Sequence, residues 1–246
     1  MIKVFKDLDN IPDSLLDRKT EKRRNICIKD NKYHQKKEFH QRYKQADIKA
    51  TLKLIYHEKC AFCEKKIREC KDNNLEECSS TVEHYRPKSK YHWLAYSWDN
   101  LLWCCHRCNQ NKDNNFETLA DEVSYEEEFR DNIHSSTEQY QEMEKPKIIN
   151  PELENILEKL SFDDGIITSD DVRVQYTIET CGLDRDSLND NRQTIIDDFV
   201  ESMIDKQQKN ESLGIIFKEL MSDFKNQESE FRALRFWLLK NYQILV

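Results

Sequence analysis

Four cysteines stand in two C-x-x-C pairs, Cys60-Ala-Phe-Cys63 and Cys105-His-Arg-Cys108, with 41 residues between the pairs. Each pair can hold one Zn²⁺ at about 2.3 Å per sulfur, and two pairs complete a tetrahedral site that leaves no position for a substrate. We therefore expect a structural zinc that stabilises a segment with few branched aliphatic side chains. The alternative is four free cysteines in a hydrophobic setting.

The ligand register at the second pair stays open, because two neighbours could take the place of Cys105: Cys104 and His106. The other cysteines show no such spacing and are expected to be ordinary small side chains: Cys27, Cys70, Cys78 and Cys181.

Four polar side chains lie between or just after the cysteine pairs, namely Glu83, His84, Asn100 and Asn109. Phosphodiester hydrolysis needs a base that deprotonates water and a divalent cation that neutralises charge on the phosphate. A neutral imidazole on His84 suits the base, and the hard oxygens of Glu83 and Asn109 suit Mg²⁺ or Mn²⁺. Asn100 is better suited to hold a loop through hydrogen bonds to the backbone.

Basic residues in the same stretch are candidates for phosphate contacts. Lys112 is three residues after Asn109, so a helix that starts near Cys108 places both on one face. Arg86 and Arg107 are further candidates. For Lys88 and Lys90, a phosphate contact and a solvated surface remain equal alternatives. Consecutive strand residues face opposite ways, so Glu83 and His84 share a site only where the strand ends or bulges, as Arg86-Pro87 indicates.

Three regions must position these residues: a basic helical region (1–58), the cysteine-rich segment (59–120) and an acidic, mainly helical region (121–246). In the first, one helical stripe ending before Cys60 is predicted from Phe39, Tyr43, Ala46, Ala50 and Leu54. This stretch either binds nucleic acid or buries its aromatic rings beneath solvated lysines.

In the second region, Val82 and residues 93–98 are expected in short strands. In the third, Asp164-Gly165 indicates a turn, Ser187 a helix cap, and Phe199 with Met203 the apolar face of a helix. The final FRALRFWLLKNYQILV predicts a terminal helix packed on the core. We therefore predict an α+β fold that is mostly α-helical, with a small zinc-bound module between two helical regions.

Charge is distributed unevenly along the 246 residues, although the net charge is only -8. Residues 1–112 carry 25 Lys and Arg against 16 Asp and Glu, a net of +9, whereas residues 113–246 carry 14 against 31, a net of -17. The first half suits a polyanion such as nucleic acid, and the second half suits a protein partner.

The expected compartment is the cytoplasm. No apolar run approaches the roughly 20 residues of a membrane-spanning helix, and MIKVFKDLDN lacks the pattern of a secretory signal. In that compartment thiols stay reduced, which favours metal binding over disulfides.

The order C-x-x-C, EHYRPKS and WDNLLWCCHRCNQNK resembles the HNH endonucleases of the ββα-metal type that carry a zinc site. His84, Asn100 and Asn109 then occupy the three signature positions, the third being Asn rather than His. The resemblance implies that His84 is the general base, that Asn100 orders the loop, and that Glu83 and Asn109 hold the catalytic cation.

A narrower resemblance comes from CAFCEKKI, EHYRPKS and the later INPE and DDGII strings. Together they are similar to the PtuB-type HNH nucleases of Septu and retron-associated antiphage systems. That resemblance implies a PtuA-type ATPase as partner. The sequence therefore predicts a Mg²⁺- or Mn²⁺-dependent endonuclease that cuts DNA or RNA, and the alternative is a noncatalytic zinc module that binds nucleic acid or a partner protein.

Overall fold

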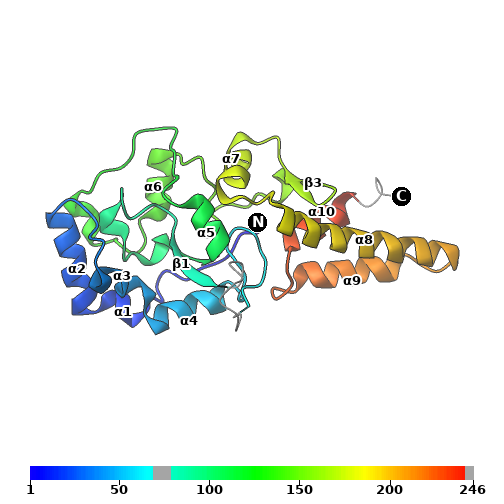
Figure 1. Ribbon diagram of the computed structural model, residues 1–246, viewed down its shortest axis with the longest axis horizontal. Helices are drawn as coiled ribbons and strands as arrows, with labels where there is room; N and C mark the ends of the chain where they lie inside the picture. Colours follow the sequence, from blue (N-terminus) through cyan, green and yellow to red (C-terminus); the bar gives the residue numbers. More distant parts are fainter. Residues whose placement is uncertain (69–78, 242–246) are drawn as a thin grey trace.

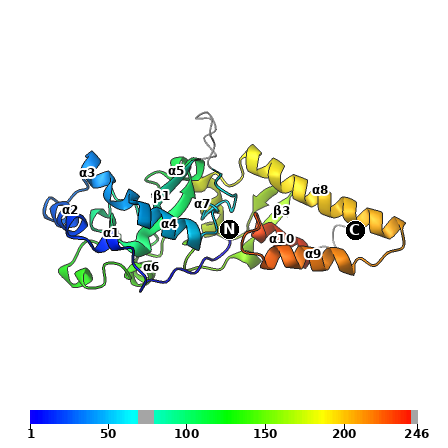
Figure 2. The same cartoon turned by 90° about the horizontal axis from the view of Figure 1, so that it is seen from below.

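The computed structural model describes residues 1–68 and 79–241 and shows a mostly helical chain with two small antiparallel sheets (Figure 1). This confirms the predicted α+β class. The sheets contain two strands each, β1 with β2 and β3 with β4. Helices surround the first sheet (Figures 1 and 2), and the candidate site residues lie in the segment of the chain that forms this sheet.

The N-terminal region consists of short helices: α1 (Asp13–Leu16), α2 (Arg18–Lys29), α3 (Lys37–His40), η1 (Arg42–Lys44) and α4 (Ala46–Ile55). The predicted continuous stripe is wrong, because the chain is extended at Gln45 between η1 and α4. Helix α4 turns Ile48 and Leu52 inward and leaves Leu54 76% exposed. Two aliphatic residues one turn apart bury more apolar area than the alanines of the predicted face.

The cysteine-rich segment forms a ββα unit of β1 (Ser80–His84), β2 (Leu101–Cys105) and α5 (His106–Lys112). The strands are antiparallel, with Ser80 opposite Cys105 and His84 opposite Leu101, and α5 packs on both. The expectation of a strand at 93–98 is wrong. That stretch lies between β1 and β2 and contains the 3₁₀ turns η3 (His92–Leu94) and η4 (Trp98–Asn100), with its large side chains in the core.

Between residues 121 and 241, the C-terminal region has two short 3₁₀ turns, one hairpin and five helices. Their bounds are η5 (Glu127–Arg130), α6 (Thr137–Glu144), η6 (Leu157–Lys159), β3 (Ser161–Asp163), β4 (Ile166–Thr168), α7 (Val172–Cys181), α8 (Asp186–Gln208), α9 (Gly214–Lys225) and α10 (Arg232–Asn241). The predicted turn at Asp164-Gly165 is confirmed. Both residues have positive φ, 45° and 74°, as a tight two-residue hairpin turn requires.

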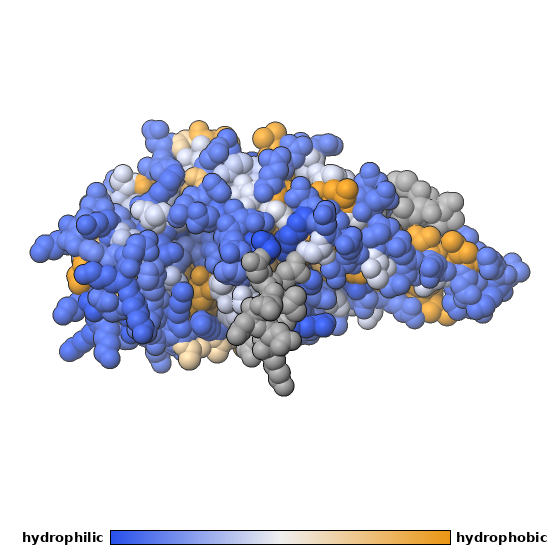
Figure 3. Space-filling model, in the orientation of Figure 1, coloured by the Kyte–Doolittle hydropathy of each residue, from blue (hydrophilic) through white to orange (hydrophobic). Residues whose placement is uncertain are grey.

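Helices α8 and α9 form a hairpin that extends away from the rest of the molecule (Figures 1 and 2). Helix α8 begins at Asp186, with Arg185 rather than Ser187 as its cap residue. Phe199 and Met203 lie on its buried face, as predicted. Apolar colour gathers over the outer part of this hairpin (Figure 3). Ile204 of α8 and Ile215 of α9 are about half exposed.

Both flanking regions contact the ββα unit through buried polar groups. From the N-terminal region, the Lys6 ammonium donates to the carbonyl oxygens of Trp98 and Leu101, at 3.1 and 2.5 Å. The Tyr85 hydroxyl donates to the carbonyl of Ile148 at 2.9 Å. Within the described ranges, no helix is both long enough and apolar enough to cross a membrane.

Candidate active site and metal centre

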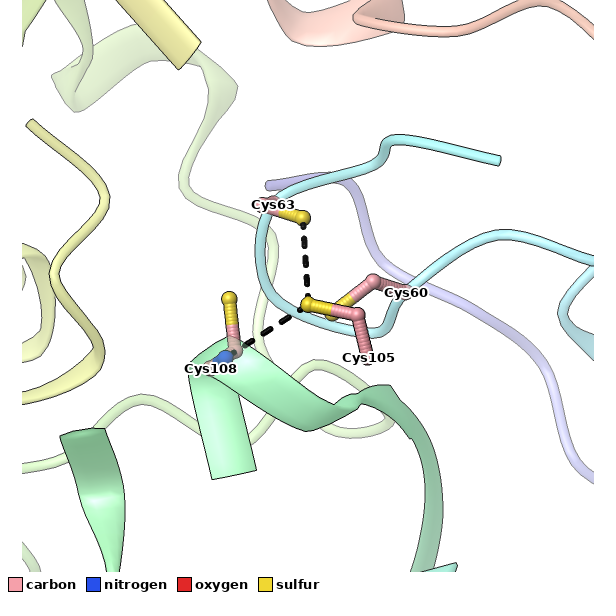
Figure 4. A group of neighbouring side chains, drawn as sticks. All are labelled: Cys60, Cys63, Cys105 and Cys108. Carbon is pink, nitrogen blue, oxygen red and sulfur yellow. Dashed lines mark hydrogen bonds between the residues drawn. The ribbon is translucent and has the colours of Figure 1, made fainter. Parts of the chain in front are cut away.

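The sulfurs of Cys60, Cys63, Cys105 and Cys108 converge on one point, and all four side chains are buried (Figure 4). The four Sγ atoms lie within 4.8 Å of one another, and those of Cys63 and Cys105 are 3.9 Å apart. A tetrahedral Zn²⁺ with bonds of about 2.3 Å needs sulfurs about 3.8 Å apart. The spacing and the all-thiol donor set therefore fit a structural metal ion such as zinc.

The local backbone explains how the two pairs meet. Cys105 caps α5, and its Sγ accepts the Cys108 amide hydrogen at 3.5 Å. After the first pair, Glu64 has φ of 62°, the left-handed conformation that reverses the chain. Hydrogen bonds from Cys104 and Cys108 lower the pKa of Cys105, which favours the thiolate that binds metal.

On the open question of register the same geometry favours Cys105, since the cluster that could hold a metal contains Cys105 and neither Cys104 nor His106. Cys104 is nevertheless close, with its Sγ 3.6 Å from that of Cys60. Cys27 and Cys181 are buried and are not members of the cluster, while the expectations for Cys70 and Cys78 fall outside the described residues.

Glu83 and Lys112 form a buried ion pair that joins β1 to α5. The Lys112 ammonium donates to Glu83 Oε1 at 2.8 Å and to the His84 carbonyl at 2.9 Å. The Lys112 side chain is fully buried. Burial raises the pKa of Glu83, and the neighbouring ammonium opposes that shift. Lys112 is thus placed to orient Glu83 and the end of β1.

His84 faces away from this ion pair, as expected for consecutive strand residues. Its Nε2 lies 3.0 Å from the Ala95 carbonyl, and its ring meets the Tyr43 ring edge-on at 4.5 Å. A carbonyl only accepts hydrogen bonds, so Nε2 carries the hydrogen and Nδ1 keeps the lone pair. Burial, followed by the charge of Lys88, holds the pKa of His84 well below its usual range. The imidazole is therefore neutral near pH 7 and has one basic nitrogen.

Asn100 and Asn109 have different surroundings. Asn100 is fully buried; its Oδ1 accepts from the Arg86 amide at 2.7 Å, and its Nδ2 donates to the carbonyls of Arg86 and Leu94. These bonds tie the chain after β1 to the turn before β2. Asn109 lies on α5 one turn before Lys112, and its Nδ2 donates to Thr81 Oγ1 at 2.8 Å.

The donor set suits a hard divalent cation, because Glu83 offers a carboxylate and Asn109 an amide oxygen on facing surfaces of β1 and α5. Lys112 engages only one of the two carboxylate oxygens, Oε1. Since the ammonium also offsets the charge of Glu83, we expect such a cation to bind mainly together with an anionic phosphate.

The two arginines predicted to contact phosphate have different environments. Arg107 lies on the first turn of α5 and is partly exposed. Arg86 is fully buried, its Nε donating to Glu144 Oε2 at 2.7 Å. Its guanidinium lies 5.3 to 5.6 Å from the ring centroids of Tyr85, Phe116 and Tyr140. Arg86 is thus placed to join the ββα unit to α6 rather than to meet a substrate.

Replacing Arg86 with methionine is expected to destabilise the fold by about 3–5 kcal/mol, because Glu144 would keep a buried charge without its partner. Chemical denaturation of the two proteins measures this difference. The control is Lys147→Met, which breaks the exposed pair with Glu117 and should cost at most about 1 kcal/mol. Equal costs for the two variants would contradict the assignment.

Sequence reasoning did not predict that Tyr33, His40, Tyr43 and Lys88 lie together beside His84. The two tyrosines are buried, and the Lys88 ammonium is 5.6 Å from each ring centroid. The available signal was the alternation of aromatic and basic residues at 33–44, together with the lysine in EHYRPKS. Neither signal indicates that residues 33–44 and the EHYRPKS segment contact each other in the fold.

No protein-family model matches the chain. Two curated proteins are similar to the chain in sequence. The Septu protein PtuB of Bacillus mycoides (strain KBAB4) is 28% identical over 173 residues, which are 64% of this chain and 53% of the relative. The Septu protein PtuB of Bacillus thuringiensis is 38% identical over 65 residues, 26% of this chain and 23% of the relative. The match thus spans about half the length of the first relative and about a quarter of the second. By sequence, this chain is similar to Septu PtuB proteins.

Proposed function

We propose that this chain is a metal-dependent HNH endonuclease and the nuclease subunit of a bacterial antiphage defence system of the Septu or a related retron-associated type. One observation carries the proposal: four cysteine sulfurs converge beside a ββα unit in which Glu83 and Asn109 lie between β1 and α5, while His84 ends β1 with its ring on the opposite face of the strand. The similarity to PtuB proteins supports the same assignment.

In this proposal the chain supplies a base, cation ligands and a rigid frame. Nδ1 of His84 accepts a proton from the attacking water, while the Ala95 carbonyl holds the ring through Nε2. Glu83 and Asn109 hold Mg²⁺ or Mn²⁺, which supplies positive charge toward the phosphate when bound. Lys112 positions Glu83, and Asn100 fixes the loop after β1.

The N-terminal region is proposed as the surface that meets nucleic acid. A groove of about 350 Å³ lies between α2 and α3, with basic side chains in its wall that include Lys19, Lys22 and Arg23. Exposed lysines occur in the same part of the chain at positions 32, 36, 37 and 44. Phosphate backbones are bound by such basic surfaces without regard to sequence, so DNA and RNA are both candidate substrates.

A protein partner is proposed for the acidic region 121–246. Its 14 Lys and Arg against 29 Asp and Glu give a net charge of -15, which repels nucleic acid, and the α8–α9 hairpin carries exposed apolar side chains such as Ile204, Ile215 and Met221. A surface that is both apolar and charged suits a protein interface. Similarity to PtuB supports a PtuA-type ATPase as this partner, acting in the cytoplasm, where the cysteines stay reduced.

Cleavage is expected to require a divalent cation apart from the zinc. The full chain, alone and with a PtuA-type ATPase, is incubated with labelled single- and double-stranded DNA and RNA in Mg²⁺, Mn²⁺ or Ca²⁺. We expect nicking or cutting of at least one substrate in Mg²⁺ or Mn²⁺, and at least about 100-fold less in Ca²⁺, whose larger radius and looser geometry suit this chemistry poorly. Binding with no cleavage in any combination would instead favour the noncatalytic zinc module.

A further inference from the structure

The basic side chains near His84 differ in whether a carboxylate of the protein is bound to them. Lys112 is bound to Glu83, and Arg86 is bound to Glu144. Lys88 is partly exposed, and among residues 1–68 and 79–241 it forms no ion pair within 4.0 Å. A lysine without a carboxylate partner beside a candidate catalytic histidine is available to an anionic ligand.

Two tyrosines from the N-terminal region hold Lys88 in place. Its ammonium lies 5.6 Å from the ring centroid of Tyr33 and 5.6 Å from that of Tyr43, within the range of a cation–π contact. His40 links the same two rings, with Nδ1 3.3 Å from the Tyr33 hydroxyl and 3.2 Å from the Tyr43 hydroxyl. The position of Lys88 is thus set before any ligand arrives.

The Tyr43 ring also contacts His84, edge-on at 4.5 Å, so one aromatic side chain touches both the candidate base and the lysine clamp. The Lys88 charge acts on both catalytic candidates: after burial it lowers the pKa of His84, and after burial and Lys112 it lowers that of Glu83. The Tyr43 ring, which contacts both side chains, thus places the Lys88 ammonium close to the His84 imidazole.

We propose that Lys88, clamped between Tyr33 and Tyr43, is the active-site cation that binds the phosphate backbone of the nucleic acid at the bond to be cut. The inference rests on the proposed nuclease function and adds a substrate-binding residue to it. Its consequence is that the active site is composite, because residues 33–44 complete a site whose base and cation ligands come from residues 83–109. A fragment of residues 59–120 alone would lack this clamp.

The test measures binding separately from catalysis. Full-length protein in the His84→Ala background is titrated against fluorescein-labelled oligonucleotides of the cleaved type, by anisotropy at several salt concentrations. Lys88→Met keeps an unbranched side chain between the rings and removes the charge. We expect about 10- to 100-fold weaker binding, since a hydrogen bond to a charged group is lost, and a salt slope smaller by about one.

The matched control is Lys90→Met, two residues away, which removes an exposed lysine paired with Glu122 and should change affinity less than about twofold. Lys88→Arg keeps the charge and should restore most of the binding. In the cleavage-competent background, Lys88→Met should raise KM at nearly unchanged thermal stability. A structural lysine would instead lower the melting temperature and leave KM unchanged.

The outcomes separate the two proposals. Cleavage by the wild type, with Lys88→Met and Lys90→Met indistinguishable in affinity and salt slope, would overturn the inference and leave the nuclease function intact. Failure of Lys88→Arg to restore binding would overturn the role of the charge. Neither binding nor cleavage of any nucleic acid by the wild type would overturn both.

Discussion

Replacing His84 with alanine is expected to slow phosphodiester cleavage about 10²- to 10⁴-fold, the usual contribution of a positioned general base. The Ala95 carbonyl fixes the tautomer by accepting the Nε2 hydrogen, which leaves Nδ1 as the basic nitrogen. Burial keeps the ring neutral near pH 7. Single-turnover cleavage with saturating enzyme measures the chemical step without a contribution from product release.

Two further variants decide whether the loss is catalytic. His84→Gln retains an amide that can donate to Ala95 but has no basic nitrogen, so it should be as inactive as His84→Ala while its melting temperature stays closer to that of the wild type. His57→Ala removes a partly exposed histidine that pairs with Glu228, and its activity should equal that of the wild type. Wild-type rates for His84→Gln would contradict the role of His84 as the base.

The parts of the site that could be predicted from sequence are those made by local chain geometry. Two C-x-x-C pairs specify a four-sulfur cluster wherever the chain brings them together, and Asn109 and Lys112 share a helix face because they are three residues apart. The position of Asn100 in a turn indicated a side chain that bonds to backbone, and the structure gives it three such bonds.

The parts that could not be predicted depend on partners distant in sequence. Arg86 has the charge and the sequence position expected of a phosphate ligand, yet it forms a buried ion pair with Glu144, which lies 58 residues later in the chain. For Lys88 the sequence left a phosphate contact and a solvated surface both open, and it did not reveal that Tyr33 and Tyr43 lie beside this lysine. The prediction of one helical stripe before Cys60 was wrong for a similar reason. Apolar periodicity does not say which of two possible helix faces the tertiary core will bury.

Replacing Cys63 or Cys108 with serine is expected to remove one zinc per chain and to unfold the ββα unit, which is the largest stability effect we predict. Structural zinc contributes about 10–16 kcal/mol in small zinc-binding domains, comparable to the entire stability of a typical domain. Elemental analysis gives the zinc content, and near-UV circular dichroism reports packing around Trp93, Trp98 and Trp103, all of which are buried. Cleavage should disappear with the metal, because β1 and α5 would no longer hold Glu83 and Lys112 together.

Cys104 provides the control, because it is as buried as the four ligands and its sulfur lies 3.6 Å from that of Cys60, yet it is outside the four-sulfur cluster. Cys104→Ala should keep one zinc and lose only the energy of a small cavity, about 1 kcal/mol. Cys105→Ala, one position along the same strand, should lose the metal entirely. Loss of zinc from Cys104→Ala together with retention of zinc in Cys105→Ala would mean that Cys104, and not Cys105, is the zinc ligand. Cys105, rather than its neighbour, caps α5, so a zinc ligand at Cys104 would also displace Asn109 and Lys112 from the faces on which the proposed chemistry depends.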